Sequence, residues 1–266
     1  MKSILTATAL LTLLLAYSAL TAQEDLTAKQ IADKSFQVTK LAGSEAVSTM
    51  TIMDSKGRKR IRKVAQITKL CDKGDTEKKL IRFLAPADVK GTGLLTFDYK
   101  EQDDDMWLYM PALRKTRRII SSEKAKSFMG SEFSYADITP PTLDDFNYKN
   151  LGEQEAGGTL CWKIEMVPLD DDIADENGFS RKISFIGKAD FVIRKAIYYD
   201  LDGELLKELE VKEIRELDTK HHKYRPIHMI MVNKQNDRKS ILKVDKIQFS
   251  PDVKDEFFTT RYLERE

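Results

Sequence analysis

Thr159-Leu-Cys-Trp-Lys-Ile-Glu-Met-Val167 is the stretch of sequence that decides the fold, because its apolar and polar side chains alternate residue by residue. Successive side chains of an extended chain point to opposite faces, so Trp162, Ile164 and Met166 share one face and charged residues share the other. One apolar face and one wet face are typical of antiparallel sheets. The stretch therefore predicts an antiparallel strand whose apolar face lies on a core.

Similar short segments rich in Val, Ile, Thr, Phe and Tyr follow one another along the chain, separated by turn clusters such as Asp54-Ser-Lys-Gly57 and Gly157-Gly158. Few long helices interrupt them, and no repeat or low-complexity linker divides them. This succession predicts a mainly β protein with a few helices, built on a single large antiparallel sheet that is curled or partly closed. The predicted strands are 47–53, 60–70, 79–84, 93–99, 106–110, 116–120, 148–153, 159–167, 181–186, 191–199, 205–216, 227–232 and 240–249.

One helix is predicted before the first strand. Thr27-Ala-Lys-Gln30 has the residues of a capping box, and Leu26 and Ile31 flank the cap as a hydrophobic staple. The helix is expected to end near Gly43 and to lie against the sheet through an apolar stripe. The residues of that stripe are Ala28, Ile31, Ala32, Ser35 and Phe36.

The N-terminus has the layout of a secretory signal peptide. Lys2 precedes an uncharged apolar run over residues 4–19, which ends in small residues up to Ala22. The run is shorter than the roughly 20 apolar residues of a spanning helix. We expect a signal peptide at 1–22 and a single functional domain at 23–266. No cysteine follows the run, so the exported protein is expected to be soluble and not lipidated.

The charge of the chain is balanced. It has 44 Lys and Arg against 43 Asp and Glu, and loss of Lys2 with the signal peptide would leave 43 of each. Nucleic-acid-binding domains carry a net basic charge or a one-sided basic stripe, so no nucleic-acid partner is predicted. The basic run at 58–63 is interpreted as a solvated strand face, with contact to a membrane surface as the alternative.

No cofactor or metal site is predicted. Cys71 and Cys161 could form one disulfide in an oxidising compartment, and their spacing leaves open whether they are bridged or free. It matches no zinc or redox motif. His221 lies in a polar turn with a second histidine, and the acidic runs 103–105 and 170–172 lack the ligand spacing of a calcium loop, so charged loops are expected there.

Motifs of catalysis are missing as well. The sequence contains no G-x-S-x-G elbow and no glycine-rich loop that opens a helix. The chain is therefore predicted not to be an enzyme. An enzymatic alternative would need acids such as Asp98, Glu132 or Asp137 to converge in a cavity at perturbed pKa.

The segment 121–135 between the two series of strands follows neither the helical nor the strand period. It carries the large apolar side chains of Phe128, Met129, Phe133 and Tyr135 among serines and glycine. Such a loop either fills the core or covers a ligand as a lid, and the sequence leaves both open. The nearby stretch 106–110 is apolar on both faces and should be covered on both, by helices on one side and sheet on the other.

Several stretches together resemble a known family. They are Trp107-Leu-Tyr-Met-Pro-Ala-Leu-Arg114, Arg117-Arg-Ile119, Ser127-Phe-Met-Gly-Ser-Glu-Phe-Ser-Tyr135, Tyr199-Asp-Leu-Asp-Gly203 and Phe258-Thr-Thr-Arg-Tyr-Leu263. The set is similar to the outer membrane lipoprotein-sorting proteins, LolA-like carriers of the periplasm, and spans most of the chain. The family commonly has Asp where this sequence has Glu132, which keeps an acid at that position and leaves its contact open.

The resemblance implies a half-open β-barrel with an apolar concave side under helices and a mobile loop. It implies a periplasmic carrier that binds acyl chains of lipoproteins or lipids and moves them toward the outer membrane. An inner-membrane exporter and an outer-membrane acceptor are the implied protein partners. The alternative function is an accessory subunit that docks on such an exporter and holds no ligand.

An acyl chain in water costs about 0.8 kcal/mol per exposed CH₂, so a carrier needs an apolar cavity. Aromatic and methionine side chains can repack around varied chains. The strand residues are otherwise ordinary core. We expect the cavity to be lined by Met50, Ile52, Trp107, Tyr109, Trp162, Ile164 and Met166, with Phe128, Met129, Phe133 and Tyr135 at its entrance.

Overall fold

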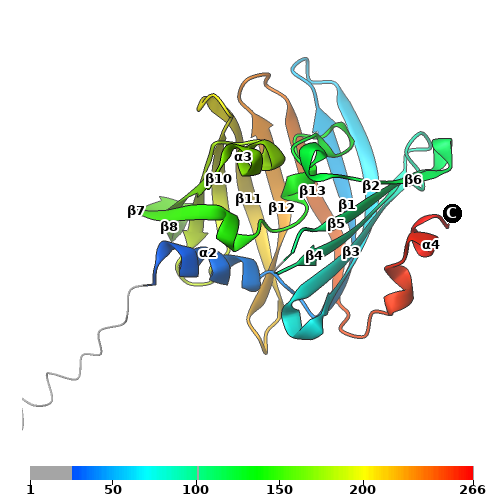
Figure 1. Cartoon of the computed structure of the whole chain (residues 1–266), viewed down its shortest axis with the longest axis horizontal. Coiled ribbons are helices and arrows are strands. Elements are labelled where there is room, and N and C mark those ends of the chain that lie inside the picture. The colour runs from blue at the N-terminus through cyan, green and yellow to red at the C-terminus, as the bar shows by residue number, and fades with distance from the viewer. Residues whose placement is uncertain (1–25, 101, 266) are drawn as a thin grey trace, which may run out of the picture.

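The computed structural model describes residues 26–100 and 102–265 (Figure 1). The predicted signal peptide at 1–22 lies outside these residues. Within them, no helix has both the length and the apolar character that crossing a membrane requires.

One antiparallel sheet contains all thirteen strands of the described part of the chain. The alternating segments thus form strands as predicted, and most bounds agree within a few residues. The predicted strand at 191–199 begins two residues later, because Phe191 has a φ of 58°, which an extended chain does not adopt. The strands are β1 Gly43–Met53, β2 Lys59–Cys71, β3 Thr76–Ala85, β4 Gly93–Tyr99, β5 Asp105–Met110, β6 Lys115–Arg118, β7 Phe146–Ala156, β8 Thr159–Pro168, β9 Arg181–Gly187, β10 Ile193–Tyr199, β11 Leu205–Asp218, β12 Lys223–Asn233 and β13 Lys239–Phe249.

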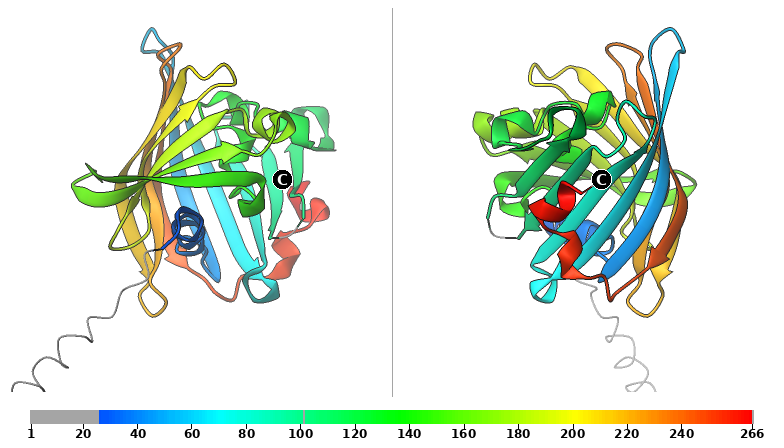
Figure 2. Two further views of the ribbon diagram at one scale, coloured as in Figure 1. Left: turned by 60° about the vertical axis from the view of Figure 1, so that its left-hand side comes forward. Right: turned by 90° about the vertical axis from the view of Figure 1, so that its right-hand side faces the viewer.

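The strand order explains why the sheet is curled but open. The chain starts at the centre with β1 and proceeds strand by strand to the edge strand β6. It then crosses to the opposite edge strand, β7, and returns to β13 beside β1. Because β6 and β7 do not pair, the barrel stays half-open, as the resemblance implied (Figure 2). The segment 119–145 has to span the open side, since it joins the two edges.

The first helix, α2 Ala28–Gln37, starts as predicted. The Thr27 side chain accepts from the Gln30 backbone, and the Gln30 side chain accepts from the backbone of Thr27. The helix ends earlier than expected, and Gly43 is the first residue of β1. A Cβ on Gly43 would lie 2.1 Å from the Ser250 carbonyl oxygen, so glycine permits the close pairing of β1 with β13.

Strand β5 is buried on both faces, as its sequence predicts. Met106 and Leu108 face the concave side. They pack under the segment 119–145, which we call the crossing segment. Trp107 and Tyr109 face the convex side, where the C-terminal segment 253–263 covers them. The expected cover by helices is found on the convex side, where the chain end is largely helical (Figure 2). The expected sheet on the other side was wrong, because the segment 119–145 covers the concave side instead.

One other sequence-based expectation needs correction, and the open question about the two cysteines is answered. The acidic run at 170–172 is not a loop, because the Asp170 side chain caps the short helix α3 Asp171–Asn177 by accepting from the Ile173 backbone. Cys71 and Cys161 form no disulfide, and both are free thiols on strands far apart in the sheet. The remaining helical elements are the 3-10 turns η2 Asp72–Gly74, η3 Pro111–Leu113, η4 Ser121–Glu123, η5 Phe128–Gly130, η6 Tyr135–Asp137, η7 Leu143–Asp145 and η8 Asp255–Phe257, and the C-terminal helix α4 Thr260–Leu263.

Candidate ligand-binding cavity

A cavity of about 340 Å³ lies on the concave side of the sheet, between the strands, α2 and the crossing segment. Its volume falls at the lower end of the range of about 300–1,000 Å³ that is typical of small-molecule sites. Both halves of the sheet line it with apolar side chains. These include Val64, Ile81, Leu209, Leu242, Val244 and Ile247.

Methionines give part of this lining an adaptable shape. Met50 on β1 and Met166 on β8 line the cavity from different halves of the sheet. Met229 and Met231 line it from β12, which lies between β1 and β8 in the sheet. Methionine is unbranched and has a polarizable thioether, so it fills irregular space and tolerates different neighbours. The cavity wall can therefore repack around apolar chains of different shape.

The crossing segment contributes two phenylalanines to the cavity wall. Phe128 and Phe133 line the cavity and are 1% and 8% exposed. The Phe128 N–H donates to the Phe133 carbonyl at 2.7 Å, which closes a tight loop at 128–133. At its tip Met129 and Gly130 have φ values of 52° and 73°, and glycine adopts this left-handed conformation without strain. We call the segment 127–137 the lid.

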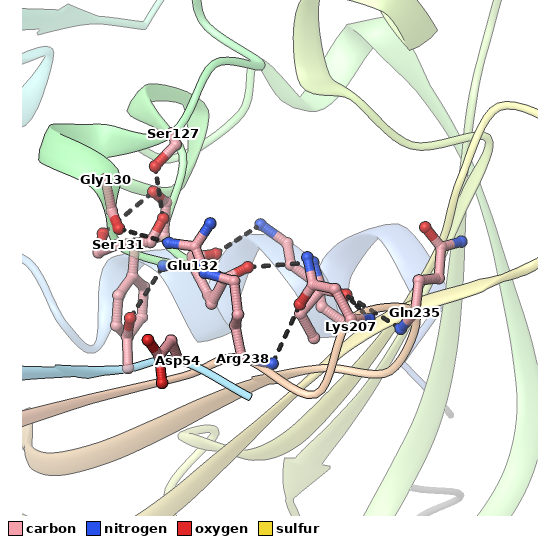
Figure 3. A network of polar contacts seen from close by, with 12 residues as sticks. Asp54, Ser127, Gly130, Ser131, Glu132, Lys207, Gln235 and Arg238 are labelled. Atoms are coloured by element: carbon pink, nitrogen blue, oxygen red, sulfur yellow. Dashed lines mark hydrogen bonds and ion pairs between the residues drawn. The ribbon is translucent and has the colours of Figure 1, made fainter. Parts of the chain in front are cut away.

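Polar contacts fasten the lid to strands β12 and β13 (Figure 3). The Glu132 carboxylate lies 2.9 Å from Arg238 Nε and accepts from Asn233 at 3.0 Å. Its backbone N–H donates to the Ser240 hydroxyl at 2.9 Å, and Arg238 also donates to the Gly130 carbonyl at 2.8 Å. We call these contacts the latch. They show that the acid at position 132 contacts Arg238 and Asn233.

Four charged side chains line one part of the cavity, and with Asp98 behind Lys40 they form a group of five that we call the paired cluster. Lys40 lies 3.1 Å from Asp98, and Glu77 lies 3.8 Å from Lys79 and 3.1 Å from Arg225. Burial raises the pKa of Asp98 to about 6 despite Lys40. Burial acts to raise the pKa of Glu77 too, but Lys79 and Arg225 outweigh it and lower that pKa. Each cation here has a carboxylate partner.

The second charged group is a row across β8 to β11, which we call the lysine row. Met166 is registered opposite Lys182, Lys182 opposite Tyr198, and Tyr198 opposite Lys207. Lys182 Nζ and Lys207 Nζ lie 4.8 and 4.9 Å from the centre of the Tyr198 ring. From the lid, Asp137 pairs with Lys207 at 2.7 Å and accepts from the Tyr198 hydroxyl at 3.2 Å.

Lys182 differs from Lys207 in having no carboxylate oxygen within 4.0 Å among the described residues. Burial lowers the pKa of Lys182 to about 8, and Asp137 opposes this shift while Lys207 adds to it. Burial acts to raise the pKa of Asp137, but the ion pair with Lys207 outweighs it and holds the pKa below its ordinary value. The lysine row therefore holds two cations against one anion.

The structure brings four of the sequence-predicted residues to the cavity wall. They are Met50, Phe128, Phe133 and Met166. Met129 and Tyr135 belong to the lid and pack with Ile52 of β1 in one apolar cluster. These three predicted residues thus hold the lid on the sheet without lining the cavity.

The other predicted residues lie elsewhere. Trp162 and Ile164 are on the concave face but pack under α2, in the cluster of Ile31. Trp107 and Tyr109 are on the convex face, so their expected place on the cavity wall was wrong. Strand β5 is apolar on both faces, and the alternation in its sequence does not tell which face is concave.

The three acids of the enzymatic alternative do not converge. Asp98 belongs to the paired cluster, Asp137 to the lysine row and Glu132 to the latch, and each faces a different cation. In the described part of the chain, no three His, Cys, Asp or Glu side chains form a group that could hold a metal ion. The three acids are thus engaged in three separate ion pairs instead of one acid centre.

Comparisons with known proteins agree on one family. A family model described as an uncharacterized protein matches residues 75–265. A solved outer membrane lipoprotein-sorting protein domain from Vibrio parahaemolyticus is 27% identical with a TM-score of 0.81, over 90% of this chain and 98% of that chain. A DUF1329 family protein from Desulfovibrio piger is 28% identical with a TM-score of 0.80, over 89% of this chain and 97% of that chain.

A more distant structure shares the fold. A LolA superfamily protein from Nitrosomonas europaea is 16% identical with a TM-score of 0.67, over 90% of this chain and 100% of that chain. No curated protein matches the chain. The similarity to solved structures thus extends over nearly the whole length of each chain.

Proposed function

Because the chain belongs to the LolA-like family of outer membrane lipoprotein-sorting proteins, we propose that it is a periplasmic carrier of acyl chains. In this proposal the segment 1–22 directs export, and the single domain at 23–266 binds the acyl chains of lipids or lipoproteins in the cavity. It moves them toward the outer membrane without chemistry. An inner-membrane exporter would load the carrier, and an outer-membrane acceptor would unload it.

The observation that carries this proposal is an apolar cavity closed by a lid. Phe128 and Phe133 of the lid line it, and methionines from opposite halves of the sheet line its wall. Transfer of an acyl chain from water into such a wall gains about 0.8 kcal/mol per CH₂. A chain of ordinary length would therefore be held firmly, yet without any covalent bond.

Release of the ligand requires that the lid can open, and the contacts of the latch are of a kind that can break. The lid contains no regular helix or long strand, and its ties to β12 and β13 are polar side-chain contacts at Glu132, Arg238 and Asn233. Such contacts contribute about 0.5–3 kcal/mol each, and water can replace them. Opening of the lid would expose the phenylalanines and the cavity to an acceptor.

A binding assay tests the proposal. Nile red fluorescence in the cavity, and its displacement by dodecanoate, measures occupancy of the apolar wall. Leu242→Trp should weaken both, because Leu242 lines the cavity between its two halves and the larger ring would fill it. Ile241→Trp is the matched control, since the preceding residue of β13 points to the opposite face.

Wild-type protein that takes up neither Nile red nor dodecanoate, with the fold intact by circular dichroism, would contradict the proposal. That result would favour the accessory subunit that docks on an exporter without a ligand. Equal loss of binding in both tryptophan variants would also contradict it, because the convex face should not matter.

A further inference from the structure

We propose that the carrier selects amphiphiles with an anionic headgroup, a carboxylate or a phosphate, and that Lys182 pairs with this headgroup inside the cavity. This inference rests on the carrier function proposed above and assigns the polar end of its ligand.

The sheet register places Lys182 on the cavity wall. Its cross-strand neighbours are Met166 on β8 and Tyr198 on β10, and all three side chains line the cavity. Residues directly opposite each other on neighbouring strands share one face. The ammonium group is thus flanked by an apolar side chain and an aromatic ring, both of which a ligand's chain could follow.

The charges around Lys182 leave it without a counter-ion. Asp137 is the nearest acid that influences it, but that carboxylate is already bound by Lys207 at 2.7 Å and by the Tyr198 hydroxyl at 3.2 Å. Asp137 also accepts from the Ser134 backbone at 2.8 Å, so its oxygens are engaged. A second anion is therefore missing from the lysine row.

Lys182 is half-buried, and an ammonium group that is withdrawn from water without a partner is costly. Burial accordingly shifts the pKa of Lys182 down to about 8, so the group is still mostly charged at neutral pH. A ligand oxyanion beside it would restore the balance of two anions against two cations. The lysine row would then be neutral when loaded and positively charged when empty.

The paired cluster has no cation without a carboxylate partner. Lys40, Lys79 and Arg225 each lie within 4.0 Å of a carboxylate, at 3.1, 3.8 and 3.1 Å. An incoming anion would have to compete with Asp98 or Glu77 there. The headgroup is therefore assigned to the lysine row, and the acyl chain to the methionine-lined wall between the two charged groups.

Calorimetric titration with three ligands of one chain length tests this assignment. Dodecanoate and dodecyl phosphate should bind the wild-type protein about ten- to a hundredfold more tightly than dodecan-1-ol, as expected for one hydrogen bond to a charged partner. Lys182→Met should abolish that preference and leave dodecan-1-ol unaffected. Lys182→Arg should retain it, because the charge remains.

Lys163→Met is the matched control. Lys163 lies on β8, with its ammonium group 5.9 Å from the Phe185 ring on the opposite face, and its loss should change no affinity. Inorganic phosphate without an alkyl chain should not bind measurably. If it binds as tightly as dodecyl phosphate, the site serves a free anion and the headgroup assignment is wrong.

The outcomes separate the two proposals. Equal affinity of the wild-type protein for dodecanoate and dodecan-1-ol overturns the headgroup assignment and leaves the carrier intact. No binding of any amphiphile overturns both. If Lys182→Met does not fold, the comparison of acid and alcohol in the wild-type and Lys182→Arg proteins still decides the question.

Discussion

The two charged groups of the cavity have the same excess of one cation but distribute it differently. In the paired cluster Asp98 and Glu77 reach all three cations directly. In the lysine row Asp137 reaches Lys207, and Lys182 is left over. One group is complete within the protein, whereas the other lacks an anion.

The difference teaches how to distinguish a structural ion pair from a binding group inside a carrier. Removing one partner of a complete buried pair leaves an uncompensated charge and destabilises the fold. Removing a charge that has no partner relieves a cost that the fold already bears. Removing Lys182 and removing one member of a complete ion pair should therefore change the stability of the ligand-free protein in opposite directions.

The largest effect is expected for Asp137→Asn. The change deprives Lys207 of its partner and leaves the lysine row without an anion, so urea unfolding at pH 7 should show a loss of about 3–5 kcal/mol. Asp245→Asn is the control, because its ion pair with Lys63 is partly exposed and contributes about 0–1 kcal/mol. A loss below that of the control would show that the lysine row does not depend on Asp137.

The same substitution should change the response to acid. The pKa of Asp137 is held below its ordinary value of 3.8 in the fold. As the pH falls, the unfolded chain therefore binds this proton before the folded protein does. The stabilisation is present above the ordinary pKa and is lost as the pH falls through the pKa of the folded protein. Wild-type stability should fall more steeply than that of Asp137→Asn over this acid range.

Lys40→Met should destabilise the protein by a smaller amount, about 1–3 kcal/mol at pH 7. The pKa of Asp98 is already raised to about 6, so this carboxyl can take up a proton when its partner is lost. A raised folded pKa gives stability that is lost as the pH rises through it, so the variant should regain stability below pH 6. Lys29→Met, on the preceding helix α2 and in an exposed pair with Asp144, should change little.

Lys182→Met should stabilise the ligand-free protein by about 1–3 kcal/mol at pH 7. The folded pKa of about 8 lies below the ordinary 10.5, so the folded protein releases this proton first. Wild-type stability should therefore rise between about pH 8 and pH 10.5, and the gain of the variant should shrink over the same range. A variant that is less stable at pH 7 would show that Lys182 has a partner within the fold.

The smallest effect on stability is expected for Glu132→Gln in the latch, about 1 kcal/mol. Loss of the charge weakens the contact with Arg238, so the lid should open more often. Hydrogen exchange should increase over 127–135, and Nile red should exchange faster, with little change in affinity. Glu153→Gln, in an ion pair with Lys188 whose side chains are 42% and 36% exposed, is the control and should change neither rate.

Most of the fold could be predicted from the sequence because the strands alternate clearly and the turns are marked. The capping box at Thr27 and the apolar positions of β8 lead directly to a helix on a curled sheet. Where a strand is apolar on both faces, as β5 is, alternation divides the residues into two sets without telling which is concave. Trp107 and Tyr109 were placed on the wrong face for this reason.

The charged groups of the cavity could not be predicted from local sequence. A lysine in a strand is normally assigned to the wet face, and Lys182 follows Arg181 without any apolar alternation. Its place beside Tyr198 and Lys207 follows only from the pairing of three strands, in which a register shift between Tyr198 and Tyr199 sets the partners. Asp137 reaches Lys207 only because the lid crosses the open side of the sheet. This crossing follows from the strand order and from no local sequence pattern.

Native mass spectrometry of the protein purified from the periplasm, followed by extraction and identification of the bound molecule, tests the carrier function most directly. We predict one amphiphile per protein, with an acyl chain and an anionic headgroup. A mass that equals the protein alone, and that stays unchanged after incubation with lipid, would contradict the carrier function.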